Sequence, residues 1–278
     1  MCDPGERVGQ RERTREVWNS RRARTLSCQV VQLTVAHLYP ELLNIYADRG
    51  NIAVLNWRAA QRHIELTVCS VDDGTELPSD TDLVYIGGGQ DRDQQLIAPD
   101  IARRGPALSS LVEAGCGLLA VCGGYQLLGQ SYRDISGNEM PGAGLFPIRT
   151  RAEHHRLIGD VLLECDFVDG PPRRIAGFEN HAGRTELDEG ADSFGRVVHG
   201  FGNDGQSGYE GCRLGSAIGT YLHGPLLPRN PWLADWLLER ALQHRTGEPR
   251  ELPPLDDALE SSAQELAGER ARTRGGRF

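Results

Sequence analysis

Cys122 stands where an apolar segment ends and two glycines follow, and this setting suits a nucleophile. Residues 117–121 (GLLAV) have the pattern of a short buried parallel strand, and Gly123 and Gly124 permit a backbone turn too tight for a side chain. A helix that begins near residue 125 would place the cysteine at a helix N-terminus, where the partial positive charge favours the thiolate over the thiol. The pattern predicts a cysteine nucleophile. The alternative is a buried structural cysteine, because cysteine is among the most buried residue types.

A thiolate nucleophile needs a group that transfers protons, and His223 is the best placed of the chain's eight histidines. It follows the apolar run at 217–222 and precedes the glycine and proline at 224–225. This predicts a position at a strand end, where open parallel sheets gather their active sites. His181 also follows a predicted strand and is the rival for the same role. The alternative for either residue is a histidine that only caps a loop.

Three glycines at 87–89 end another predicted strand. They lack the lysine of a phosphate-binding loop and the acidic residue of a dinucleotide site, so they are a weak nucleotide motif. The backbone amides of Gly88 and Gly123 are instead predicted to hold the negative oxygen that develops when a thiolate attacks a carbonyl. The alternative is that the glycines only form a turn. No metal site is predicted, because the seven cysteines lack a C-x-x-C pair and the adjacent His154 and His155 point to opposite sides of their backbone.

The composition is that of an acidic globular protein. The chain has 278 residues, 39% of them hydrophobic, so it can bury one large core. Its formal net charge of −9 does not suggest a nucleic-acid partner. The segment at 20–36 resembles a twin-arginine export signal, but its apolar part is short and lacks a clear cleavage site. No stretch approaches the ~20 apolar residues that cross a bilayer, so we expect no membrane insertion. The irregular cysteine spacing favours a reduced, cytoplasmic compartment.

Three regions are expected along the chain. Residues 1–26 are predicted to be a disordered N-terminal extension, residues 27–246 the functional domain, and residues 247–278 a flexible C-terminal tail. Within the domain, strands alternate with helices in the first half, and short strands dominate the second half. This order predicts an α/β fold with a doubly wound, mostly parallel sheet flanked by helices, followed by a β-rich second half.

Four separately spaced motifs give the chain a resemblance to a known family. They are IGGG at 86–89, CGGYQ at 122–126, GFENHAGR at 177–184 and GTYLHGP at 219–225. Together they resemble the class I glutamine amidotransferases of the cobyric acid synthase (CobB/CobQ) type, and within that group the glutaminase subunits of lipid II isoglutaminyl synthase. The resemblance extends from about residue 30 to about residue 245, and it implies that residues 27–246 are a glutamine amidotransferase domain.

The resemblance implies roles for several residues. Cys122 would attack the side-chain amide of L-glutamine, His223 would protonate the departing ammonia, and water would release glutamate from a thioester. Arg156 and Gln126 would bind the glutamine, and an arginine suits this task because its planar fork can bind both oxygens of a carboxylate. The ammonia would pass to a MurT-like Mur ligase in a heterodimer, which would use ATP to amidate the D-glutamate α-carboxyl of lipid II in peptidoglycan synthesis. No cofactor is expected in this chain.

One departure from the wider class concerns the carboxylate that orients the histidine. Many class I enzymes have a glutamate two residues after it, where this chain has Pro225. We expect the carboxylate to come from another segment, such as Glu179, or from the partner. A fused cobyric acid synthase would need a G-x-x-x-x-G-K-[ST] loop, which is absent from this sequence. The alternatives are an amidotransferase subunit for another acceptor such as a corrinoid, a cysteine peptidase or deglycase of related architecture, and a non-catalytic docking subunit.

Overall fold

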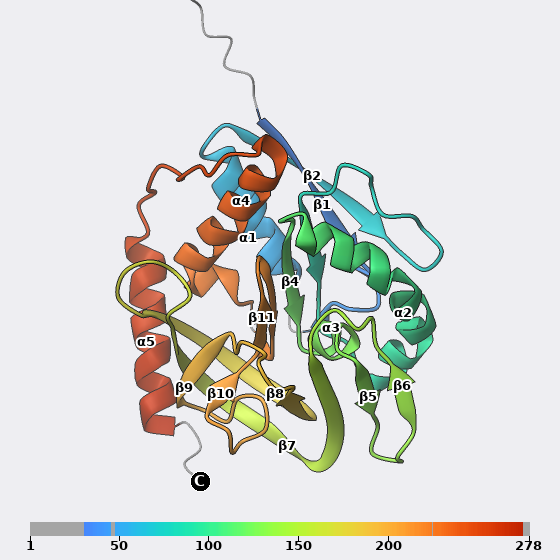
Figure 1. Ribbon diagram of the computed structural model, residues 1–278. Helices are drawn as coiled ribbons and strands as arrows, with labels where there is room; N and C mark the ends of the chain where they lie inside the picture. The colour runs from blue at the N-terminus through green and yellow to red at the C-terminus, as the bar shows by residue number, and fades with distance from the viewer. Residues whose placement is uncertain (1–30, 46–47, 224, 275–278) are drawn as a thin grey trace, which may run out of the picture. The chain divides into compact units, whose positions relative to one another are not determined.

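The computed structural model describes residues 31–45, 48–223 and 225–274, and these described residues form one compact unit. The extension at 1–26, which the sequence predicts to be disordered, lies outside the described residues. Two sheets make up most of the compact unit (Figure 1).

The first sheet has six strands in the order β11-β12-β4-β3-β1-β2. They are β1 (Val31–Leu38), β2 (Ile64–Val71), β3 (Leu83–Ile86), β4 (Gly117–Val121), β11 (Cys212–Leu214) and β12 (Ala217–Thr220). All neighbouring pairs are parallel except β11 with β12. Strands β3, β4 and β12 are buried along their whole length, as expected for a parallel sheet with helices on both faces. The predicted doubly wound, mostly parallel sheet is confirmed.

Three long helices flank this sheet. Helices α1 (Arg49–Ala60) and α4 (Pro231–Thr246) lie together on one side of the strands, and α2 (Asp91–Glu113) lies on the other (Figure 1). Helix α2 continues through two prolines, because Ile97, Ile101 and Leu108 keep one face of it buried in the core.

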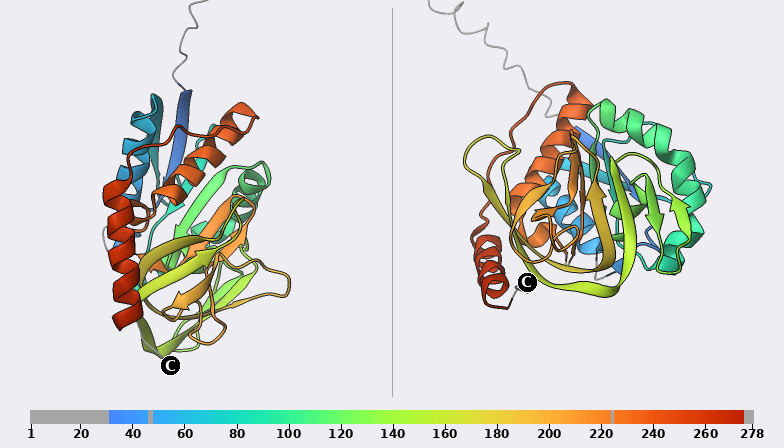
Figure 2. Two further views of the ribbon diagram at one scale, coloured as in Figure 1. Left: turned by 90° about the vertical axis from the view of Figure 1, so that its left-hand side faces the viewer. Right: turned by 60° about the horizontal axis from the view of Figure 1, so that its bottom comes forward.

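The second sheet lies beyond the carboxyl ends of the parallel strands (Figures 1 and 2). Its strands are β5 (Ser131–Arg133), β6 (Glu139–Pro141), β7 (Ile148–Cys165), β8 (Arg173–Leu187), β9 (Gly195–His199), β10 (Tyr209–Glu210) and β13 (Leu222–His223). The long antiparallel pair β7 and β8 forms its centre. Because β13 pairs with β8, this sheet is joined to the segment that follows β12. The predicted β-rich second half is confirmed.

The C-terminal region differs from the flexible tail expected for residues 247–278. It contains a 17-residue helix, α5 (Ala258–Arg274), which packs along β7 and β8 (Figure 2). Ala271 is fully buried and packs with Leu162 and Ala176. The polar composition concealed this helix, because a narrow row of alanines is enough for the contact. None of the helices in the described residues is long and apolar enough to cross a membrane.

A buried arginine connects α1 to the C-terminal region. The Arg58 side chain is 1% exposed, and its nitrogens lie 2.6 Å from carboxylate oxygens of both Asp235 in α4 and Asp257 before α5. Arg58→Ala would leave both carboxylates without this cation, so we expect the free energy of unfolding to fall by about 2–4 kcal/mol in urea denaturation. As a control, Arg133→Ala removes an exposed ion pair with Glu139 and should cost less than about 1 kcal/mol. Equal losses in the two variants would contradict the role of the buried ion pairs.

Candidate active site

The candidate residues lie together at the carboxyl ends of neighbouring strands in the first sheet. His223 follows β12, Cys122 follows β4, Gly88 follows β3, and Asp48 lies between β1 and α1. Parallel strands end at the same edge, which explains how such distant residues meet. His223 Cε1, Asp48 Oδ2 and Cys122 Cβ lie 2.7, 3.2 and 3.4 Å from the position that a β-carbon on Gly88 would occupy. The structure thus brings the predicted pair together and adds an aspartate.

Cys122 has a backbone conformation that residues with a side chain rarely adopt. Its φ is 48° and its ψ is −103°, between the end of β4 and the five-residue helix α3 (Gly123–Leu127). The amide of Cys122 donates to the Thr220 carbonyl at 2.7 Å, and its carbonyl accepts from the Gln126 amide at 3.0 Å. Such strain costs about 1–3 kcal/mol and persists where the surroundings impose it, often at functional sites. This geometry favours a nucleophile at a sharp turn over a structural cysteine.

The glycines beside Cys122 are required by close backbone contacts. A β-carbon on Gly124 would lie 2.8 Å from the carbonyl oxygen of Gly87, and one on Gly123 would lie 2.8 Å from the amide nitrogen of Gly89. The Gly124 amide also donates to the Gly87 carbonyl at 3.1 Å. The turn after β3 and the turn after β4 therefore touch backbone to backbone.

The amide of Gly88 does not have the role predicted for it. It donates to Oδ2 of Asp48 at 2.7 Å, so it holds a carboxylate in place of a substrate oxygen. The Gly89 amide lies beside Gly123, and Gly89 lines the same pocket as the nucleophile. Because Gly123 is the first residue of α3, its own amide has no partner within the helix. The geometry favours Gly89 with Gly123 as oxyanion donors, where the sequence suggested Gly88 with Gly123.

Asp48 supplies the carboxylate that is missing from the histidine motif. Its Oδ1 lies 3.6 Å from Nδ1 of His223, and both side chains are 1% exposed. Burial lowers the pKa of His223, but the negative charge on Cys122 and the Asp48 carboxylate outweigh burial and raise it to about 10. An imidazolium held between two negative groups stabilises a thiolate and keeps a proton ready for a leaving group.

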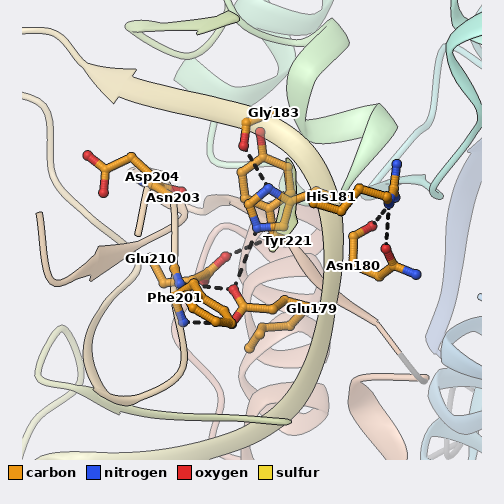
Figure 3. Close-up of polar contacts among 12 residues, drawn as sticks. Glu179, Asn180, His181, Gly183, Phe201, Asn203, Asp204, Glu210 and Tyr221 are labelled. Carbon is orange, nitrogen blue, oxygen red and sulfur yellow. Dashed lines mark hydrogen bonds and ion pairs between the residues drawn. The ribbon is translucent and has the colours of Figure 1, made fainter. Parts of the chain in front are cut away.

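Glu179 belongs instead to a buried polar cluster (Figure 3). Its two oxygens accept from the amides of Phe201 and Gly202 at 2.6 and 2.9 Å. Oε2 also lies 3.5 Å from Nε2 of His181, whose ring stacks on Tyr221 with 3.6 Å between centroids. Burial lowers the pKa of His181, so it is held as a neutral ring in the pocket wall. The expectation that Glu179 orients the catalytic histidine is wrong, because its carboxylate is committed to this cluster.

The site opens into a pocket of about 450 Å³ that includes both predicted substrate-binding residues. The guanidinium of Arg156 in β7 is held by Asn180, to whose Oδ1 and carbonyl it donates at 2.7 and 2.6 Å. This arrangement leaves Nη1 for a carboxylate. Gln126 is only 4% exposed; its Oε1 accepts from Gln94 at 3.1 Å and its Nε2 donates to Tyr221 at 3.2 Å. Its amide is therefore engaged at both ends within the protein, and Arg156 is the more accessible of the two.

Known proteins with similar sequences show the family of this chain. The CobB/CobQ-like glutamine amidotransferase domain matches residues 34–231, which is most of the chain. The chain belongs to this family. It is 38% identical, over 86% of its length and 96% of the relative's, to subunit GatD of the glutamine-hydrolysing lipid II isoglutaminyl synthase of Staphylococcus aureus. For the GatD subunit of Streptococcus pneumoniae the identity is 36%, over 86% and 90%. The cobyric acid synthase of Brucella canis is 30% identical over 72% of this chain and 40% of its own length.

Asp48 is one residue of the candidate site that the sequence alone did not reveal. It follows the end of β1 by ten positions in a polar stretch, and no motif contains it. The one available signal for Asp48 is the order of the strands. Because β1 lies next to β3, the connection that leaves β1 must pass the glycines at 87–89. The predicted absence of a metal stays a prediction; within the part of the chain that the structure describes, no three metal-ligating side chains are grouped.

Proposed function

We propose that this chain is the glutaminase subunit of a lipid II isoglutaminyl synthase. It hydrolyses L-glutamine to glutamate and passes the ammonia to a MurT-like Mur ligase in a heterodimer, which amidates the D-glutamate α-carboxyl of lipid II. The observation that carries the proposal is the meeting of Cys122, His223 and Asp48 around Gly88, beside a pocket lined by Arg156. Similarity to two GatD subunits over nearly their full length supports the choice of acceptor and partner.

Each step of glutamine hydrolysis has a residue placed for it. The Cys122 thiolate attacks the amide carbon, and the amides of Gly89 and Gly123 hold the negative oxygen. His223 gives its proton to the amide nitrogen, the C–N bond breaks, and ammonia leaves a γ-glutamyl thioester on the sulfur. The neutral imidazole then takes a proton from water, which attacks the thioester and releases glutamate and the thiolate. Asp48 orients the ring and stabilises its protonated form.

The remaining chemistry is assigned to the partner. Activation of a carboxyl group by ATP needs a nucleotide site, and this sequence has no phosphate-binding loop of the P-loop type. ATP is therefore bound by the ligase, and this chain works without a cofactor of its own. We place the complex in the cytoplasm, since the five cysteines of the described residues are all free and one is the nucleophile.

Assay of both products tests this function. The purified chain receives L-glutamine, alone and with the ligase, ATP and lipid II, while glutamate release and amidation of lipid II are measured. We expect both products from the complex. Amidation of a corrinoid in place of lipid II would reassign the acceptor. A failure to release glutamate under every condition would contradict the glutaminase assignment and favour a peptidase, a deglycase or a docking subunit.

Arg156 should contribute mainly to substrate binding. Arg156→Ala removes the cation that faces the α-carboxylate, so kcat/KM for L-glutamine should fall about ten- to a hundredfold, chiefly through a higher KM. Arg156→Lys should recover part of the loss, since it keeps the charge but not the fork. The control Arg151→Ala changes an exposed arginine of β7 that pairs with Glu153 and is not part of the pocket. An equal effect of both alanine substitutions would rule out a specific role for Arg156.

A further inference from the structure

The pocket beside Cys122 has an uneven set of charges. Among the described residues that line it, the carboxylate is Asp91 and the arginines are Arg92 and Arg156. Free glutamine has an α-carboxylate and an α-ammonium group on one carbon. Arg156 accounts for the carboxylate, so the ammonium group still needs an anionic partner.

Asp91 is fixed in position by two elements. It is the first residue of α2, and its Oδ1 accepts from the hydroxyl of Tyr132 in β5 at 3.1 Å. Tyr132 is 2% exposed and lines the same pocket as Asp91. Asp91 itself is exposed, which leaves its second oxygen for a ligand. A carboxylate in the first turn also favours the helix dipole, but Asp93 serves that purpose equally without lining the pocket.

We propose that Asp91 binds the α-ammonium group of the substrate and restricts the site to free α-amino acid amides. The inference rests on the proposed glutamine hydrolysis. With Arg156 on the carboxylate, both charges at the α-carbon are matched, and the reactive amide is directed toward Cys122. A glutamine residue within a peptide has no α-ammonium group, so the same carboxylate would be left without its counterion and the peptide would be rejected. A charge-assisted hydrogen bond of this kind should favour substrates that have the α-ammonium group over those that lack it by about ten- to a hundredfold in kcat/KM.

The test compares L-glutamine with glutaramate, which has the same amide and carboxylate but hydrogen in place of the α-ammonium group. In the enzyme with its partner, kcat/KM should favour L-glutamine by about ten- to a hundredfold. Asp91→Asn keeps the shape and an acceptor for Tyr132, and it should lower kcat/KM for L-glutamine by that factor, mainly through KM. The value for glutaramate should stay within about twofold. The matched control Asp93→Asn removes the other carboxylate of the first turn and should leave both substrates unaffected.

Two results would overturn the inference. Equal losses for both compounds would show that Asp91 only supports the fold, and no loss for either would show that the ammonium group binds elsewhere. In both cases glutamate release by the unchanged enzyme would leave the proposed function intact. If the unchanged enzyme releases no glutamate, the proposed function fails instead. Calorimetric binding of both compounds to Cys122→Ala protein, with and without Asp91→Asn, then decides the inference without turnover.

Discussion

Replacing Cys122 by alanine should abolish glutamate release while the chain still folds and binds its partner. The expected loss is about 10⁴-fold or more in kcat, because no other group can form the thioester and the oxyanion donors alone give little rate. Binding of L-glutamine should persist, since Arg156 and Asp91 are untouched. Amidation of the acceptor should continue when ammonium salts replace glutamine, because the partner's chemistry does not need the sulfur. Measurements of glutamate release, with glutamine and then with ammonium as nitrogen source for the complex, check these outcomes.

Two other cysteines give matched controls for this substitution. Cys69 is half-buried in the edge strand β2, and Cys69→Ala should leave the rate within about twofold. Cys116 lies in the core, and burial raises the pKa of its thiol to about 12, so it should resist alkylation at neutral pH. Iodoacetamide should therefore inactivate the enzyme by modifying Cys122, and L-glutamine should protect it. Persistent amidation with glutamine after Cys122→Ala would instead make this chain a docking subunit.

The sequence alone was sufficient to predict those parts of the site that a local residue pattern specifies. The run before Cys122 has one interpretation as a buried strand, and β4 occupies the predicted residues 117–121. The fold then requires glycines at 123 and 124 for the tight turn after β4. It also requires the neighbouring strand to end shortly before His223. Because neighbouring parallel strands end together, the meeting of Cys122 and His223 could be expected before any coordinates.

The rest depends on contacts between distant segments. Asp48 reaches the site because β1 pairs with β3, and its carboxylate then captures the Gly88 amide that the sequence had assigned to the oxyanion. The position of Glu179 in a motif suggested that it orients His223. The pairing of Glu179 with Leu222 brings only the backbone of Glu179 next to the segment that contains His223. The length and packing of helix α5 were not predicted for a similar reason, since its small buried face can be recognised only from its contact with β7 and β8. Each of these features requires knowledge of the sheet order.

Asp48→Asn should have the second-largest effect on catalysis. The substitution keeps the size of the side chain and an acceptor for the Gly88 amide but removes the negative charge 3.6 Å from Nδ1 of His223. We expect kcat to fall by about 10²- to 10⁴-fold, because the ring loses both its orientation and the charge that stabilises its protonated form. The pH profile gives a separate readout. A negative neighbour favours the charged imidazole, so removing it must lower the pKa of His223 from about 10, and the alkaline decline of kcat/KM must begin at lower pH.

The comparison with Glu179→Gln separates orientation of the histidine from support of the fold. Glu179 is fully buried and holds the amides of Phe201 and Gly202, so its neutral variant should lower the free energy of unfolding without moving the alkaline limb. Asp48→Asn should also lower kcat by the same factor with and without the partner, since the carboxylate belongs to this chain. If the partner supplied the orienting carboxylate, the isolated chain would be insensitive to Asp48→Asn and only the complex would show the alkaline limb near pH 10.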